Sequence, residues 1–238
     1  MTERLIEILE IEKGDLVAIT GSGGKTSLMM ALAADLKNFG SVLISPSTKI
    51  GLPSKGQVDY VFTSLDHYQS QDYSKKILVL GEKIPAKDKL AAIDQEALRE
   101  ISKDFAYVLV EADGARRLPL KFWQPYEPVI YDFSTKAVAV FPLKVLGREA
   151  GSDFIYNYPA FQAQIKDQVI SKGTIEKLIL SKPGPFADFA GPKYVFISQV
   201  ESQEEIQRAR DLVGYLRDKF PGIKFFYGST KEHSYYED

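Results

Sequence analysis

The feature that most constrains this chain is a short apolar run that leads through a glycine-rich turn into a segment with helical spacing. Residues 16–20 are all apolar or β-branched and predict a strand buried on both faces. Residues 21–24 include three glycines, and residues 27–39 predict a helix that ends at Gly40. A strand followed closely by a helix is the repeating unit of parallel sheets, so we expect an α/β protein.

Further apolar runs alternate with helical or turn-rich segments along the chain. This alternation predicts one wide, mostly parallel sheet with helices on both faces, a three-layer Rossmann-like arrangement of the kind found in P-loop NTPases. We expect a single domain over residues 1–238, with a peripheral helical region around residues 143–192 and a packing helix over residues 203–219. The further predicted strands are residues 42–44, 60–62, 77–80, 107–111, 137–141, 194–197 and 224–227.

Two expectations concern the edges of this arrangement. If strand order follows sequence, the strand at residues 42–44 lies next to the strand at residues 16–20. The polar and aromatic tail at residues 233–238 is expected to be loosely held.

Charge and composition exclude several classes of function. Thirty Lys and Arg against thirty-two Asp and Glu give a formal net charge of -2, so no basic field is available to hold nucleic acid. The chain has no cysteine, so any bound metal is expected to have oxygen ligands. No apolar run is long enough to span a membrane, and the charged N-terminal segment does not fit a signal peptide. We therefore expect a cytoplasmic protein with neither a membrane nor a nucleic acid as its partner.

The glycine-rich turn predicts a binding site for the phosphates of a nucleoside triphosphate, ATP or GTP. Glycines let backbone N–H groups approach an anion, and the following helix adds its positive end. Lys25 is expected to reach the β and γ phosphates, and the Thr26 hydroxyl to bind Mg²⁺. The spacing departs from a strict Walker A motif, which would have a glycine at the position of Ile19. The alternative to a phosphate site is a glycine-rich turn that only starts a helix. The predicted nucleotide-binding residues are Gly21, Ser22, Gly23, Gly24, Lys25, Thr26 and Ser27.

A second group of charged residues follows the predicted strand at residues 107–111. The carboxylates of Glu111 and Asp113 are expected at the carboxyl edge of the sheet, with Asp113 as the Mg²⁺ ligand and Glu111 orienting a water or a substrate hydroxyl. Arg116, Arg117 and Lys121 suit a second anionic group or the charge that develops in phosphoryl transfer. The alternative is a solvated loop with surface ion pairs. The predicted catalytic residues are Lys25, Glu111, Asp113, Arg116 and Arg117.

Thr48 is a third metal or water contact predicted at the same edge, because it follows the strand at residues 42–44. A simple turn or helix cap would have the same sequence there, so this alternative stays open. The predicted metal ligands are Thr26, Thr48 and Asp113. The sequence does not show whether the nucleotide carries adenine or guanine, since residues 198–201 lack the asparagine and aspartate typical of a guanine-binding loop.

These motifs together resemble the YqeC family, whose members are described as accessory proteins of selenium-dependent molybdenum hydroxylases. The resemblance rests on residues 19–27, 42–49 and 110–121, with residues 127–130 beyond them. It implies a P-loop-like fold and a role in maturing a selenium-containing cofactor, with a client hydroxylase or a cofactor intermediate as partner. One hypothesis is an NTPase, kinase or ligase; the other is a nucleotide-gated assembly factor, acting on a client or on a second copy of itself.

Overall fold

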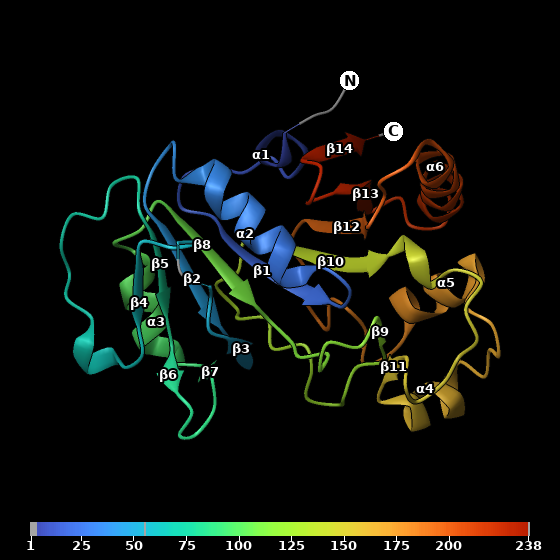
Figure 1. The fold of residues 1–238 in the computed structure, drawn as a ribbon, viewed down its shortest axis with the longest axis horizontal. Coiled ribbons are helices and arrows are strands. Elements are labelled where there is room, and N and C mark those ends of the chain that lie inside the picture. Colours follow the sequence, from blue (N-terminus) through green and yellow to red (C-terminus); the bar gives the residue numbers. More distant parts are fainter. Residues whose placement is uncertain (1–3, 55, 238) are drawn as a thin grey trace.

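A wide, mostly parallel sheet forms the centre of the protein (Figure 1). The computed structural model describes residues 4–54 and 56–237. Within them, neighbouring strands of the large sheet run parallel, except that the last two along the chain are antiparallel. From edge to edge the strands are β14 (Ser234–Glu237), β13 (Ile223–Ser229), β12 (Lys193–Ser198), β10 (Lys136–Pro142), β1 (Leu16–Gly21), β8 (Tyr107–Glu111), β2 (Val42–Pro46), β5 (Ile77–Leu80) and β4 (Tyr60–Phe62).

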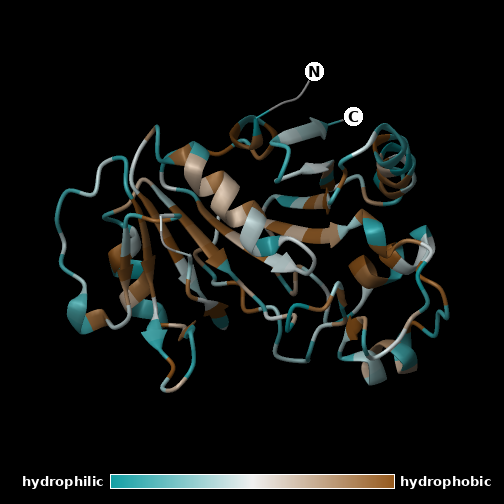
Figure 2. Ribbon diagram, viewed as in Figure 1, coloured by the Kyte–Doolittle hydropathy of each residue, from teal (hydrophilic) through white to brown (hydrophobic). Residues whose placement is uncertain are grey.

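Helices cover both faces of this sheet, which confirms the predicted α/β fold. On one face, Leu28 of α2 (Lys25–Leu36) packs with Ile19 of β1 in a core that also contains α1 (Leu5–Ile8). On the other face, α5 (Lys172–Leu180) and α6 (Gln203–Arg217) share a core with Ala18 of β1. Alternate residues of β1 thus enter different cores, as expected for a strand covered on both sides. Figure 2 shows that the central strands are predominantly hydrophobic.

The other elements are short and lie around the main sheet. Residues 143–192 contain α4 and α5, and their buried side chains join the same core as α6. The extent of the domain stays a prediction. Besides the main sheet and the helices α1, α2, α5 and α6, one small sheet contains β3 (Lys49–Gly51), β6 (Glu82–Lys83) and β7 (Lys89–Ala91), and another contains β9 (Leu120–Lys121) and β11 (Ile155–Tyr156). The remaining elements are the helices α3 (Gln95–Ser102) and α4 (Tyr158–Gln164) and the 3-10 turns Leu65–His67 and Leu143–Val145.

In the described part of the chain, no helix has both the length and the apolar character that crossing a bilayer requires.

Two expectations about the edges of the sheet were wrong. β8 lies between β1 and β2, so the strand that follows β1 in sequence is not its neighbour in space. The tail is not loosely held either, because β14 pairs antiparallel with β13 and buries Tyr235. This pairing satisfies backbone groups that an exposed edge strand would leave open. Asp238 lies outside the described residues.

The strand order brings three chain segments to one edge of the sheet. β1, β8 and β2 are parallel neighbours, so their carboxyl ends emerge side by side. The chain runs from β1 to β2 on one side and later reaches β10 on the other side of β1. Ligands of open α/β sheets bind at such a reversal of strand order, outside the carboxyl ends. The fold therefore places the predicted site residues after β1, β2 and β8 at a suitable edge.

The packing of α2 against the sheet predicts a large effect of trimming its buried face. Leu32 is fully buried, so Leu32→Ala is expected to lower the free energy of unfolding by about 2–5 kcal/mol in urea denaturation. Phe39, just beyond the same helix, is 61% exposed, and Phe39→Ala is expected to change it by less than about 0.5 kcal/mol. Equal effects of the two substitutions would contradict this packing.

Candidate functional site

The turn between β1 and α2 has a backbone that requires glycine. Gly21, Gly23 and Gly24 have φ values of +94°, +70° and +143°, a region that other residues rarely adopt. Space is restricted as well. A Cβ at Gly21 would lie 2.3 Å from the carbonyl oxygen of Val140, and one at Gly23 would lie 2.3 Å from the Pro142 side chain. The turn is therefore pressed against the end of β10, with Gly21 and Ser22 buried and Gly23 and Gly24 partly exposed.

Polar contacts from two neighbouring strands fix this turn. Ser22 N–H donates to the carbonyl oxygen of Val140 in β10 at 3.1 Å. The carbonyl oxygen of Gly23 accepts from Ser198 Oγ at 2.8 Å and from Gln199 Nε2 at 3.1 Å. Residues 198 and 199, which we examined as a base-reading loop, thus support the glycine-rich turn in this structure.

Lys25 begins α2 and folds back over the turn. Its Nζ donates to the carbonyl oxygen of Gly21 at 2.7 Å, and lies 3.1 Å from Asp113 Oδ1 and 3.9 Å from Glu111 Oε1. The side chain is only 6% exposed. Burial alone would lower the pKa of Lys25, but the negative charges of Asp113 and Glu111 outweigh burial and raise the pKa. The ammonium group therefore stays charged.

Glu111 connects the end of β8 to the first turn of α2. Thr26 Oγ1 donates to Glu111 Oε2 at 2.9 Å. Glu111 pairs in register with Ile19 of β1, so the pairing of β1 and β8 places its carboxylate beside the start of α2. Burial raises the pKa of Glu111, and the charge of Lys25 and the Thr26 hydrogen bond offset this effect only in part. Of the two predicted carboxylates, Glu111 is the one that contacts Thr26.

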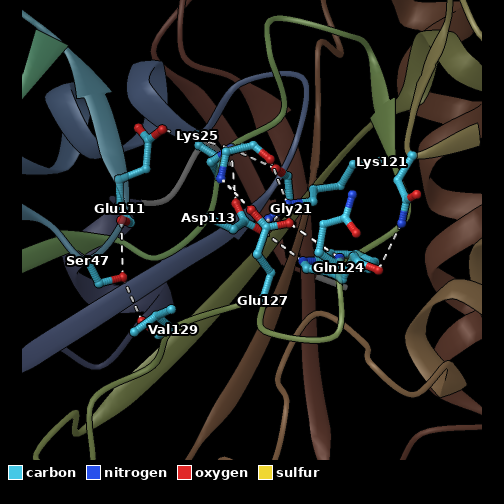
Figure 3. Close-up of polar contacts among 12 residues, drawn as sticks. Gly21, Lys25, Ser47, Glu111, Asp113, Lys121, Gln124, Glu127 and Val129 are labelled. Carbon is cyan, nitrogen blue, oxygen red and sulfur yellow. Dashed lines mark hydrogen bonds and ion pairs between the residues drawn. The ribbon is translucent and has the colours of Figure 1, made fainter. Parts of the chain in front are cut away.

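Asp113 is fully buried, and its two carboxylate oxygens have different surroundings (Figure 3). Oδ2 accepts from Gly21 N–H at 2.9 Å and from Trp123 Nε1 at 2.6 Å, and lies 3.2 Å from Lys121 Nζ. Oδ1 has no hydrogen-bond partner among the described residues, and its ion pair is with Lys25. Asp113 therefore links the end of β1 to the segment that follows β8.

Lys121, Trp123 and Glu127 belong to this cluster, although sequence analysis gave them other roles or none. Lys121 is buried rather than available to a second anion: its Nζ lies 2.9 Å from Glu127 Oε2 and donates to the carbonyl oxygen of Gly114 at 2.7 Å. Trp123 packs in the core, and its indole N–H donates to Asp113. Glu127 lies in residues 127–130, which belong to the family resemblance, but nothing in the local pattern predicts that its carboxylate is buried beside Lys121.

Arg116 and Arg117 lie in the loop between β8 and β9 and are exposed. Both have left-handed backbones, with φ values of 49° and 64°. The Arg116 guanidinium stacks over the Tyr156 ring, with its carbon 5.5 Å from the ring centroid. Both arginines lie on the surface, a few residues after Asp113 in the chain. Their catalytic role stays a prediction.

Several buried hydroxyls near this edge have no hydrogen-bond partner within the described residues. Two of them, Thr48 Oγ1 and Ser22 Oγ, belong to residues that we predicted as ligand contacts. Such groups cost free energy unless water or a ligand satisfies them. The hydroxyl of the preceding residue, Ser47, does have a partner: it donates to the carbonyl oxygen of Val129 at 2.6 Å (Figure 3). The metal role of Thr48 stays a prediction.

The buried charge of Glu111 predicts a measurable cost in the ligand-free protein. A carboxyl whose pKa is raised by folding destabilises the fold above that pKa, and the cost disappears as pH falls toward the ordinary value of 4.5. Glu111→Gln keeps an acceptor for Thr26 and is expected to raise the unfolding temperature at pH 8 by about 2–4 °C, equivalent to about 1 kcal/mol. The gain should shrink by pH 5.

Thermal unfolding without nucleotide or Mg²⁺ measures this effect. Glu100→Gln is a matched control, because Glu100 is exposed on α3 and pairs only at the surface with Lys103. A lower unfolding temperature of Glu111→Gln at pH 8 would contradict the expected cost of the charge.

Comparisons with known proteins place this site within a family. A family model described as "YqeC protein" matches residues 17–159, a range that includes the glycine-rich turn and Lys121 to Glu127. A protein of Escherichia coli (strain K12) described as "Uncharacterized protein YqeC" is 25% identical over 161 residues, which cover 66% of this chain and 63% of that relative. No solved structure matches the chain. Because the family model covers more than half of its length, the chain belongs to the YqeC family.

Proposed function

We propose that this protein binds ATP or GTP together with Mg²⁺ and hydrolyses it or transfers its phosphoryl group. The observation that carries this proposal is the glycine-rich turn, which presents its backbone at a sheet edge with Lys25 folded over it. A polyphosphate needs backbone N–H groups and a cation at close range; the uncapped start of α2 supplies the N–H groups and Lys25 supplies the cation.

The start of α2 supports an anion site at the turn. No side chain caps this helix, so its first N–H groups are left for another acceptor. Ser22 adds a buried hydroxyl with no partner among the described residues. In our proposal Lys25 leaves the carbonyl oxygen of Gly21 and Asp113 to contact the phosphates. Thr26 and Ser27 are exposed, so the site is open to solvent on that side.

The residues present fit Mg²⁺ when phosphate supplies further ligands. No group of three acidic or histidine side chains suited to a metal occurs in the part of the chain that the structure describes. Mg²⁺ commonly takes one or two protein oxygens together with water and substrate phosphates. The Thr26 hydroxyl and Glu111 carboxylate, 2.9 Å apart, are suited to this role. Bound Mg²⁺ would neutralise phosphate charge. We therefore assign the metal-binding carboxylate to Glu111 rather than to Asp113.

The place of this activity in the cell is a separate part of the proposal. Arg116 and Arg117 offer exposed positive charge beside the loop that follows β8, which suits an acceptor or the charge of phosphoryl transfer. Family resemblance is what suggests maturation of a selenium-dependent molybdenum hydroxylase as the purpose. That relation is proposed for this chain from the resemblance alone.

Loss of the Lys25 ammonium is expected to abolish nucleotide binding. ATP or GTP at about one hundred times its Kd should stabilise the wild type by about 2.7 kcal/mol, or roughly 5–10 °C, and only with Mg²⁺. Lys25→Ala should show no such shift, because the phosphates lose their mobile cation. Thermal unfolding with each nucleotide, with and without Mg²⁺, measures both effects and identifies the base.

Lys37→Ala is the matched control, since Lys37 follows the same helix but pairs at the surface with Asp59. This variant should keep the full shift. Absence of any shift in the wild type with either nucleotide would refute the proposed binding.

Arg117 tests whether the exposed arginines take part in chemistry. If its guanidinium neutralises charge in the transition state, Arg117→Ala should lower nucleotide hydrolysis at least about tenfold and leave the nucleotide Kd within about twofold. Phosphate release and calorimetry measure the two quantities. Arg208→Ala, an exposed arginine on α6, should change neither. A matching loss of affinity in Arg117→Ala would instead indicate a role in binding.

A further inference from the structure

A chain of buried ion pairs extends from the glycine-rich turn to residues that the proposed nucleotide chemistry does not use. Lys25 pairs with Asp113, Asp113 with Lys121, and Lys121 with Glu127 (Figure 3). Lys121 and Asp113 have fully buried side chains, and Glu127 is 7% exposed. Buried charges of this kind are costly, and removing one partner leaves the other uncompensated. Their arrangement therefore needs an explanation beyond packing.

The asymmetry of Asp113 indicates what this arrangement does. Three donors converge on Oδ2: the Gly21 N–H, the Trp123 indole N–H and Lys121 Nζ. Oδ1, in contrast, lies beside Lys25 and accepts no hydrogen bond within the described residues. One oxygen is thus permanently satisfied, and the other is left for a cation that can leave.

We propose that Asp113 is a counter-ion that holds Lys25 while the glycine-rich turn is empty, and that Lys121 and Trp123 are positioning residues that allow its release. This inference rests on the proposed nucleotide binding. When Lys25 moves to a phosphate, Asp113 keeps three donors on Oδ2 and is not left as an unpaired buried charge. Without those donors the carboxylate would hold Lys25 more tightly, and the phosphate would have to compete for it.

Glu127 completes the arrangement by holding Lys121. It lies 2.9 Å from Lys121 Nζ, and it also accepts from the Gly114 N–H at 3.4 Å. The pairing of β9 with β11 places Lys121 opposite Tyr156, whose ring centroid is 5.4 Å from Lys121 Nζ. Lys121 is therefore fixed on several sides and stays with Asp113 when Lys25 leaves.

Removing a single donor tests this exchange. Trp123→Phe keeps an aromatic ring in the core but loses the N–H on Oδ2, and Lys121→Met loses the buried ammonium. Both variants are expected to bind Mg²⁺-tripolyphosphate and Mg²⁺-ATP or Mg²⁺-GTP more weakly by the same factor, roughly tenfold, the equivalent of one charge-assisted hydrogen bond. Isothermal calorimetry measures the affinities. An equal loss for tripolyphosphate shows that the effect concerns the phosphates rather than the base.

Phe161→Leu serves as the structural control. Phe161 is fully buried in the same core as Trp123 and has no polar group. This variant should unfold at a lower temperature and bind with wild-type affinity. If Lys121→Met does not fold, Trp123→Phe alone decides the matter.

Fluorescence provides an independent measurement in the unmodified protein. Trp123 is the single tryptophan of the sequence, and its indole N–H touches the carboxylate that loses Lys25. Tripolyphosphate has no base to absorb the exciting light, so it is the suitable probe. Binding should change the Trp123 emission, with a midpoint that matches calorimetry.

Two results would overturn the inference, and they differ from each other. If the wild type binds tripolyphosphate and nucleotide, and Trp123→Phe and Lys121→Met bind them with the same affinity, the positioning role is refuted and the proposed function is left intact. No binding of tripolyphosphate, ATP or GTP to the wild type would refute both.

Discussion

The hydrogen bond between the Gly21 N–H and the Asp113 carboxylate joins the two chain segments on which the site depends. Gly21 ends β1 and opens the glycine-rich turn, whereas Asp113 follows β8. Parallel pairing of these strands brings both residues to one edge, but it does not fix the loops beyond the strand ends. A buried carboxylate that accepts from the turn does fix them, because leaving that charge without donors would be costly. The position of Lys25 over the turn follows from this contact.

Close packing of β10 against the turn is the complementary constraint. The end of β10 leaves no room for a Cβ at Gly21 or Gly23, so the backbone itself forms the surface of the site. Ser198 and Gln199 at the end of β12 add two hydrogen bonds from further along the sheet. These contacts hold the turn from the β10 side of β1, and Asp113 holds it from the β8 side. A loop that is preorganised in this way would bind an anion without first losing conformational freedom.

Among the described residues, the sequence allowed eight of the nine strands of the large sheet and the helices α2 and α6 to be predicted, because apolar runs and helical spacing report directly on burial. The ninth strand, β14, was not predicted. The sequence did not show that β8 inserts between β1 and β2, since that order depends on contacts between distant segments. For the site, the turn and the carboxylates were identifiable by residue type. Two sets of contacts were not identifiable. The pairing of Thr26 with Glu111 depends on β8 lying beside β1, and the pairing of Asp113 with Lys121 and Trp123 depends on the path of the chain after β8.

The contrast between Glu111 and Asp113 shows how neighbouring carboxylates of one loop can acquire different roles. Glu111 meets an exposed threonine and has few donors, so burial raises its pKa and a cation would relieve that cost. Asp113 already has three donors on Oδ2 and the Lys25 ammonium beside Oδ1. Hydrophobic residues of similar volume would often be at least as stable in place of such buried pairs. Their presence at the ligand edge of the sheet, directly beside a complete hydrophobic core, is therefore best explained by binding rather than by folding.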